Sequence, residues 1–206
     1  MAIRPVAFAV LAATWCLSGC VTEDAGGSSS GTGSSDRTVR ERIDAFETLV
    51  GQEYINNVDL LSGLLKERAY PMLVDALDGN SSDRVRAGCA LSLAMGQDDR
   101  AREHLARAIA RDSNAGVRYT AAYGLCLYRD SRGLPVLFEA LRSENSQVRW
   151  DANDRLKGLT GLDFAFETTD APELREAAVA RWEAWYRQVG PGGASQALRP
   201  NGGRPR

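Results

Sequence analysis

The sequence has little of what metal sites and catalytic sites are made from. It contains one histidine, His104, and four cysteines, at positions 16, 20, 89 and 126, without a CxxC pair. Zinc sites need four ligands, usually cysteines and histidines in close pairs, so nothing supports such a site. Outside the Gly/Ser-rich residues 21–36, where residues 27–31 read GSSSG, the sequence has no GxSxG, HExxH, Gly-rich phosphate-loop or paired-carboxylate signature. We therefore expect no enzyme activity, no cofactor and no metal.

An excess of positive charge is missing too. The 25 basic residues are balanced by 27 acidic ones. Nucleic-acid binders usually carry a basic excess or stripe, so we expect no nucleic-acid partner. Hydrophobic residues make up 44% of the 206-residue chain, enough for one packed domain with tails.

No apolar run is long enough to span a membrane. The longest, residues 6–17 (VAFAVLAATWCL), follows the positive Arg4. It fits the apolar region of an export signal and falls short of the about 20 residues of a spanning helix. The next residues, Leu17-Ser18-Gly19-Cys20, resemble the bacterial lipobox. That resemblance implies a signal peptide over residues 1–19 and a diacylglycerol on the Cys20 thiol; the alternative is a plain secretory signal with an incidental cysteine.

The residues after Cys20 have the composition of a flexible linker. Residues 21–36 (VTEDAGGSSSGTGSSD) are polar and rich in glycine and serine. Sixteen such residues would span about 20–24 Å, which suits a domain held by lipid at a membrane. Residue 21 is valine rather than aspartate, and by analogy with bacterial lipoprotein sorting this favours the outer membrane, facing the periplasm. We expect residues 20–36 to be the lipidated cysteine and its linker.

The middle of the chain repeats with a period near 32 residues. Three Val-Arg pairs begin at Val85, Val117 and Val148, which are 32 and 31 residues apart. A small residue follows each valine by four positions and a leucine by eight: Cys89, Ala121 and Ala152, then Leu93, Leu125 and Leu156. This spacing places all three positions on one helical face.

A second helix keeps the same period. Pro71 and Pro135 open similar segments, and Leu73, Leu105 and Leu137 follow one another at 32-residue steps. Each repeat is therefore predicted to be a pair of helices, and stacked pairs bury a common core.

The Val-Arg, small residue, Leu pattern, with Pro-x-Leu and Ala-Leu on the second helix, resembles HEAT repeats, closest to the short bacterial kind seen in phycobilisome-lyase-type proteins. The resemblance covers about residues 69–160. It implies an all-α fold, a short right-handed α-solenoid, which we place at residues 37–188. A final helix carries Leu174, Ala178, Trp182 and Trp185 on one face, and the Gly- and Pro-rich residues 189–206 are predicted to be a disordered tail.

Such a solenoid is expected to act by holding a protein partner rather than by catalysis. We expect the second helices to supply the binding surface, with Arg102, Glu103, Arg107 and Glu139 as candidate contacts. The alternative is an accessory or catalytic protein of the bilin-lyase-like repeat type, although those proteins work inside the cell.

Two groups of residues allow more than one interpretation. Arg86, Arg118 and Arg149 form a column that is either an anion-binding ladder or, as we favour, a set of structural arginines that fix the stack. Cys89 and Cys126 fall on inward faces of first helices, as buried free thiols or, less favoured, as a disulfide.

Overall fold

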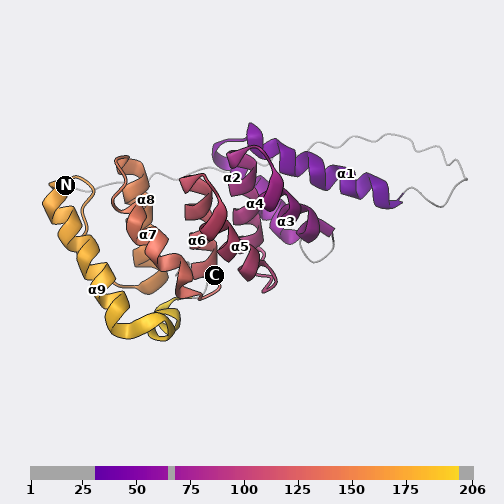
Figure 1. Cartoon of the computed structure of the whole chain (residues 1–206). Helices are drawn as coiled ribbons and strands as arrows, with labels where there is room; N and C mark the ends of the chain where they lie inside the picture. Colours follow the sequence, from indigo (N-terminus) through magenta and orange to yellow (C-terminus); the bar gives the residue numbers. More distant parts are fainter. Residues whose placement is uncertain (1–30, 65–67, 200–206) are drawn as a thin grey trace, which may run out of the picture.

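The computed structural model describes residues 31–64 and 68–199, and over these residues the chain is all-α (Figure 1). Nine α-helices and two 3-10 helices are present in these ranges, and no strand. They are α1 (Gly31–Asp44), η1 (Ala45–Glu47), α2 (Gly51–Gly63), α3 (Tyr70–Gly79), α4 (Asp83–Met95), α5 (Ala101–Arg111), α6 (Ala115–Leu127), η3 (Ser131–Gly133), α7 (Leu134–Ala140), α8 (Ser146–Thr160) and α9 (Pro172–Ala197).

The helices stack as two columns. In the first, α2 packs on α4, α4 on α6, and α6 on α8. In the second, α3 packs on α5, α5 contacts the η3 turn that leads into α7, and α7 packs on α9. Each helix thus contacts its partner in the pair and its neighbours in the stack, which confirms the predicted α-solenoid.

The repeating positions make the core. Cys89, Ala121 and Ala152 are fully buried, as are the leucines four residues later on the same helices. In the helices of the second column, Leu73, Leu105 and Leu137 are fully buried as well. Asparagine side chains cap two helices of the first column, α6 and α8. Asn114 Oδ1 accepts from Gly116 N at 2.8 Å, and Asn145 Oδ1 accepts from Gln147 N at 2.8 Å.

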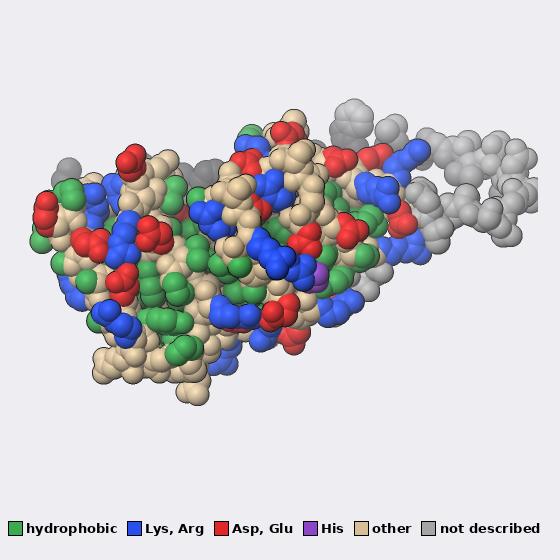
Figure 2. All heavy atoms as spheres, viewed as in Figure 1, with side chains coloured by type: hydrophobic (Ala, Val, Ile, Leu, Met, Phe, Trp, Pro, Cys, Tyr) green, Lys and Arg blue, Asp and Glu red, His purple; other side chains and the backbone are tan. Residues whose placement is uncertain are grey.

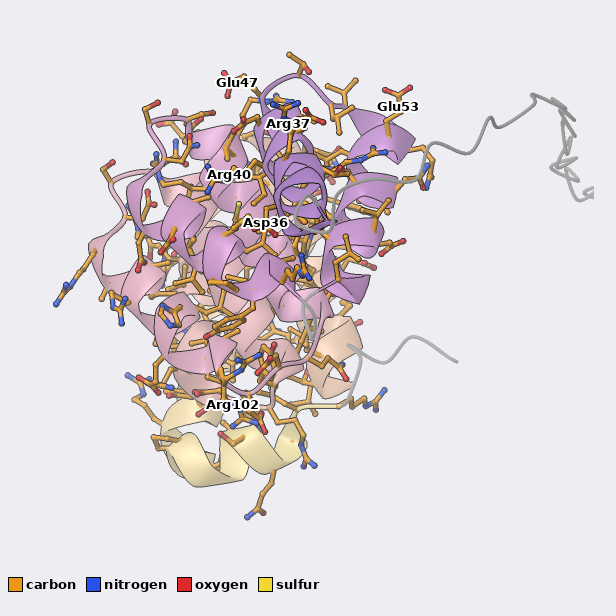
Figure 3. All side chains as sticks on the ribbon, turned by 90° about the vertical axis from the view of Figure 1, so that its right-hand side faces the viewer. Asp36, Arg37, Arg40, Glu47, Glu53 and Arg102 are labelled. Atoms are coloured by element: carbon orange, nitrogen blue, oxygen red, sulfur yellow. The ribbon has the colours of Figure 1, made fainter. Side chains whose placement is uncertain are left out.

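Helix α1 closes the N-terminal end of the stack. Its Val39 and Ile43 are buried, while Arg37 and Arg40 are exposed at this end of the molecule (Figure 3). Such a polar outer face is what a terminal repeat needs. The helix begins within the predicted linker, so residues 31–36 are helical rather than irregular. One reason is Arg68, whose Nη1 donates to Ser35 Oγ at 2.7 Å.

At the C-terminal end of the stack, the predicted boundary of the domain at residue 188 is wrong. Helix α9 buries Ala178 and Trp182, whereas Leu174, the first residue of the predicted apolar face, is exposed and lies outside the core. The helix breaks at Gly190, whose φ is 68°, and then turns back. Residues 189–199, predicted to be part of a disordered tail, are therefore part of the folded domain, because Leu198 is buried in its core.

Candidate functional site

The three arginines of the Val-Arg pairs hold the turn between paired helices. Arg86, Arg118 and Arg149 are each the fourth residue of a first-column helix. Each Nη1 donates to the two carbonyl oxygens that lie six and five residues earlier. The bonds run from Arg86 to Asn80 (2.8 Å) and Ser81 (3.2 Å), from Arg118 to Asp112 (2.8 Å) and Ser113 (3.0 Å), and from Arg149 to Ser143 (2.8 Å) and Glu144 (2.8 Å).

The rest of each guanidinium is used differently. Arg86 directs Nε and Nη2 to the Asp112 carboxylate in the next repeat, at 2.7 and 3.0 Å. Arg149 Nη2 donates to the carbonyl of Thr168 at 2.9 Å. Nε and Nη2 of Arg118 have no hydrogen-bond acceptor in the described part of the chain, and neither nitrogen is buried. Arg118 therefore has two donors open to solvent.

The open donors of Arg118 follow from one difference between repeats. Asp112 Oδ1 accepts from the N–H of the helix-capping Asn114 at 2.8 Å. One repeat later, Ser143 Oγ accepts from the N–H of the helix-capping Asn145 at 3.2 Å. Ser143 thus takes the position of Asp112 but has no carboxylate to offer to Arg118.

Arg118 lines a groove between the first halves of α6 and α8. The groove has a volume of about 870 Å³, and its walls expose mostly apolar atoms. The lining includes apolar side chains from α6, α7 and α8: Ala115, Pro135, Val136, Ala140 and Val148. In Figure 1 these three helices are neighbours between the central α5 and the terminal α9. An apolar hollow with a few directed polar groups has the usual character of a binding site.

The acidic groups of the groove already have partners. Asp151 Oδ2 accepts from the Tyr119 hydroxyl at 2.6 Å and from Arg155 Nε at 2.7 Å. Burial raises the pKa of Tyr119; Arg155 opposes this, and the Asp151 carboxylate adds to it, so the phenol stays protonated and donates. Glu139 Oε2 lies 3.4 Å from Arg142 Nη1.

Arg142, the second arginine of the groove, is also paired. Besides Glu139 it binds two carboxylates of α9, Glu176 at 2.6 Å and Glu183 at 2.8 Å. The hydrogen bond that Arg142 donates to Glu176 raises the pKa of Arg142 above its ordinary value; burial opposes this, and the hydrogen bond donated to Glu183 and the charges of both carboxylates add to the rise. Arg118 is thus the cation of this groove that has open donors.

The predicted partner surface lies only partly at this groove. Glu139 lines it, but the other three residues belong to α5. Arg102 pairs with Asp99 at 2.9 Å, Glu103 with Arg132 at 2.9 Å, and Arg107 with Asp78 at 2.9 Å. Figure 3 places Arg102 far from the α1 side chains, low in that view. Acidic and basic side chains are intermixed over the face seen in Figure 2, without a basic stripe.

The sequence did carry a signal for the groove. Aligning the repeats on their capping asparagines places Ser143 opposite Asp112, so Arg118 lacks the acidic partner that Arg86 has. The prediction of a structural column gave all three arginines one role, and the groove itself depends on how far apart α6 and α8 lie.

Several predicted features lie elsewhere or outside the described residues. The signal peptide over residues 1–19 and Cys20 are outside them. Cys89 and Cys126 are buried and free, which excludes the disulfide between them. Within the described ranges no three His, Cys, Asp or Glu side chains gather into a metal-binding group. No described helix is both long and apolar enough to cross a bilayer.

Comparison with known proteins identifies the repeat. The family model of HEAT repeats matches residues 57–126, from the middle of α2 to the end of α6. No curated protein matches the chain. The stacked helix pairs within residues 57–126 are therefore HEAT-like.

Proposed function

We propose that this HEAT-like repeat chain is a membrane-tethered scaffold that binds another protein in the bacterial cell envelope and acts without catalysis. The observation that carries the proposal is the groove between α6 and α8, with apolar walls and two open donors on Arg118. A stack of helix pairs offers an extended surface, and HEAT repeats suggest a scaffold for protein interaction. The groove is the part of that surface where a partner would find both apolar contact and a hydrogen-bonding charge.

The tether is proposed from the sequence. Lipid on Cys20 would hold the scaffold at a membrane, with the outer membrane and its periplasmic side favoured by Val21. Residues 21–30, ten residues, separate Cys20 from the start of α1. Fully extended they reach about 33–36 Å, which lets the domain search the space near the membrane surface. The mechanism is local concentration, since tethering limits the volume in which partner and groove must meet.

The binding role is tested by crosslinking in the native cell. A photoreactive amino acid replaces Gln147, which lines the groove, and in a control chain it replaces the exposed Gln52 of α2. We expect one defined envelope protein to crosslink from position 147 and not from position 52. No adduct at position 147, or the same adducts from both positions, contradicts the proposal.

The tether has its own test. Replacing Cys20 with alanine should remove the lipid mass from the mature chain and release it from the membrane fraction. Mass spectrometry and membrane sedimentation measure both effects. If the variant keeps the lipid mass and still sediments with membranes, the lipobox assignment is wrong.

A further inference from the structure

We infer that the groove between α6 and α8 recognises an acidic residue flanked by aliphatic residues in the partner protein, with Arg118 binding its carboxylate. This rests on the proposed function, because it names the chemistry of the segment that the scaffold would hold. The ligand carboxylate would take the place that Asp112 takes beside Arg86 one repeat earlier. The repeat that lacks its acid thus obtains one from the partner.

The chain itself shows the geometry of such a pair. Beside Arg86 a carboxylate accepts from Nε at 2.7 Å and from Nη2 at 3.0 Å, while Nη1 stays on the turn carbonyls. Arg118 has the same Nη1 contacts, so its guanidinium is held in place before any ligand arrives. A two-point arginine–carboxylate pair is directional and needs this fixed fork. The open Nε and Nη2 edge of Arg118 fits one carboxylate.

The acidic side chains around Arg118 are paired elsewhere, so they do not occupy its Nε and Nη2 edge. Asp112, whose pKa the charge of Arg118 helps to lower, is held by Arg86 and by the Asn114 N–H. Asp151 is held by Tyr119 and Arg155 across the groove. Since Ser143 is neutral, a ligand carboxylate would meet an unneutralised arginine in a partly buried setting, where a charge-assisted bond is stronger than in water.

The apolar walls select what is attached to the carboxylate. Val136 and Ala140 of α7 and Val148 of α8 line the groove together with Arg118. An isolated anion would leave this surface wet, whereas an extended segment can place an aliphatic side chain on it while its acid pairs with Arg118. The remaining carboxylates of the groove, on Glu139 and Asp151, disfavour a second acid beside the first.

The test measures binding of defined probes to the full-length lipoprotein in detergent micelles. The probes are the acetylated tripeptide amide Leu-Glu-Leu, its Leu-Gln-Leu analogue, and acetate. Methyl NMR signals of valine and the Nε–H signal of arginine report on Val136, Val148 and Arg118. At millimolar concentrations we expect Leu-Glu-Leu to shift these signals, with an affinity about tenfold or more above that of Leu-Gln-Leu, because the charged bond is lost in the analogue.

One substitution separates recognition from folding. Ser143→Asp restores the acid that Asp112 supplies to Arg86, and it keeps an acceptor for the Asn145 N–H. We expect it to leave helicity unchanged and to lower the affinity for Leu-Glu-Leu about tenfold or more, because the intramolecular pair occupies Arg118. Ser81→Asp, which adds the same charge at an exposed turn far from the groove, should bind like the unmodified chain. Arg118→Lys, which keeps the charge and loses the fork, should also bind weakly.

Four outcomes overturn the inference: equal affinity for both tripeptides, unchanged binding by Ser143→Asp, no shift with Leu-Glu-Leu, or the same shifts with acetate alone. The crosslinking experiment keeps the two proposals apart. If position 147 captures a defined envelope protein and the adduct persists in the Ser143→Asp chain, the scaffold function stands and recognition through Arg118 is wrong. If position 147 captures nothing, the scaffold function itself fails.

Discussion

Arg86 and Asp112 form a two-point ion pair between consecutive repeats, with Nε–Oδ2 at 2.7 Å and Nη2–Oδ1 at 3.0 Å. Both side chains are largely buried, with exposed fractions of 14% and 7%. The same guanidinium holds the Asn80 and Ser81 carbonyls of its own turn. One side chain therefore joins α4, the turn before it and the turn before α6.

Removing the charge of Asp112 should weaken the stack. Asp112→Asn keeps the size of the side chain but replaces a charged acceptor, so we expect the free energy of unfolding to fall by about 1–3 kcal/mol. Urea denaturation followed by circular dichroism measures it. Asp99→Asn is the control, because Asp99 is 81% exposed in its pair with Arg102 and should change stability by less than about 1 kcal/mol. Equal losses in the two variants would mean that the buried pair has no special weight.

The Asp112 pair also predicts a pH dependence. Burial raises the pKa of Asp112, but the hydrogen bonds from Arg86 and from the Asn114 N–H and the charges of Arg86 and Arg118 outweigh it, so the pKa lies below its ordinary value. A lowered folded-state pKa gives stability that is present above the unfolded-state pKa of about 3.9 and is lost as the pH falls through the folded-state value. The stability difference between the unmodified chain and Asp112→Asn should thus be constant near neutral pH and shrink below about pH 4. A difference that persists undiminished in strong acid contradicts this assignment.

Closure of the N-terminal end depends on a glycine. A Cβ atom on Gly88 of α4 would collide with the ring of Phe46, which is fully buried and packs against Tyr54 of α2. We expect Gly88→Ala to lower the free energy of unfolding by about 1–3 kcal/mol through overpacking. Gly63→Ala is the matched control, since a Cβ there meets nothing within 4 Å. Thermal denaturation distinguishes the two, and a Gly88→Ala chain as stable as the control would show that the ring moves aside freely.

The two buried thiols should be inert in the folded chain. Burial, with a smaller effect of Asp44, raises the pKa of Cys89 to about 12. Burial raises the pKa of Cys126 as well, with a smaller effect of Asp130. Alkylation needs the thiolate, so at pH 8 iodoacetamide should label both at least about a hundredfold more slowly than in urea-unfolded chain. Peptide mass spectrometry locates the label. Native labelling at the unfolded rate would place these thiols at the surface.

The period of the sequence was enough to predict the core. Apolar residues that recur at 32-residue steps must share a helix face and a height in the stack, and Leu73, Leu105 and Leu137 are all fully buried. The arginine column was also visible, but the separate role of Arg118 was not predicted, because finding it requires aligning the turns on their capping asparagines, which sets Ser143 opposite Asp112. The width of the groove depends on the packing of α6 against α8, which no local pattern encodes.

The predictions from composition placed both ends of the domain wrongly, and for the same reason. Glycine and proline disfavour helix on average, so Gly/Ser-rich and Gly/Pro-rich segments were predicted to be irregular. A few tertiary contacts are enough to override that preference. Ser35 is held by Arg68 at one end, and at the other a single left-handed Gly190 lets the chain return toward the core.

The returning C-terminal segment should therefore contribute to stability. Ser131 Oγ donates to the Pro191 carbonyl at 2.9 Å, Arg199 N donates to the Leu159 carbonyl at 2.7 Å, and Leu198 between these anchors is 1% exposed. Leu198→Ala should lower the free energy of unfolding by about 2–5 kcal/mol, because it leaves a cavity where the segment meets the core.

Val189→Ala is the matched control, because Val189 of α9 is 38% exposed and should change stability by less than about 0.5 kcal/mol. Urea denaturation measures both variants, and limited proteolysis should cut the Leu198→Ala chain faster after Gly190. If Leu198→Ala is as stable as the control and is cut at the same rate as the unmodified chain, residues 190–199 do not hold the end of the solenoid. The domain boundary would then return to the position near residue 188 that composition indicates.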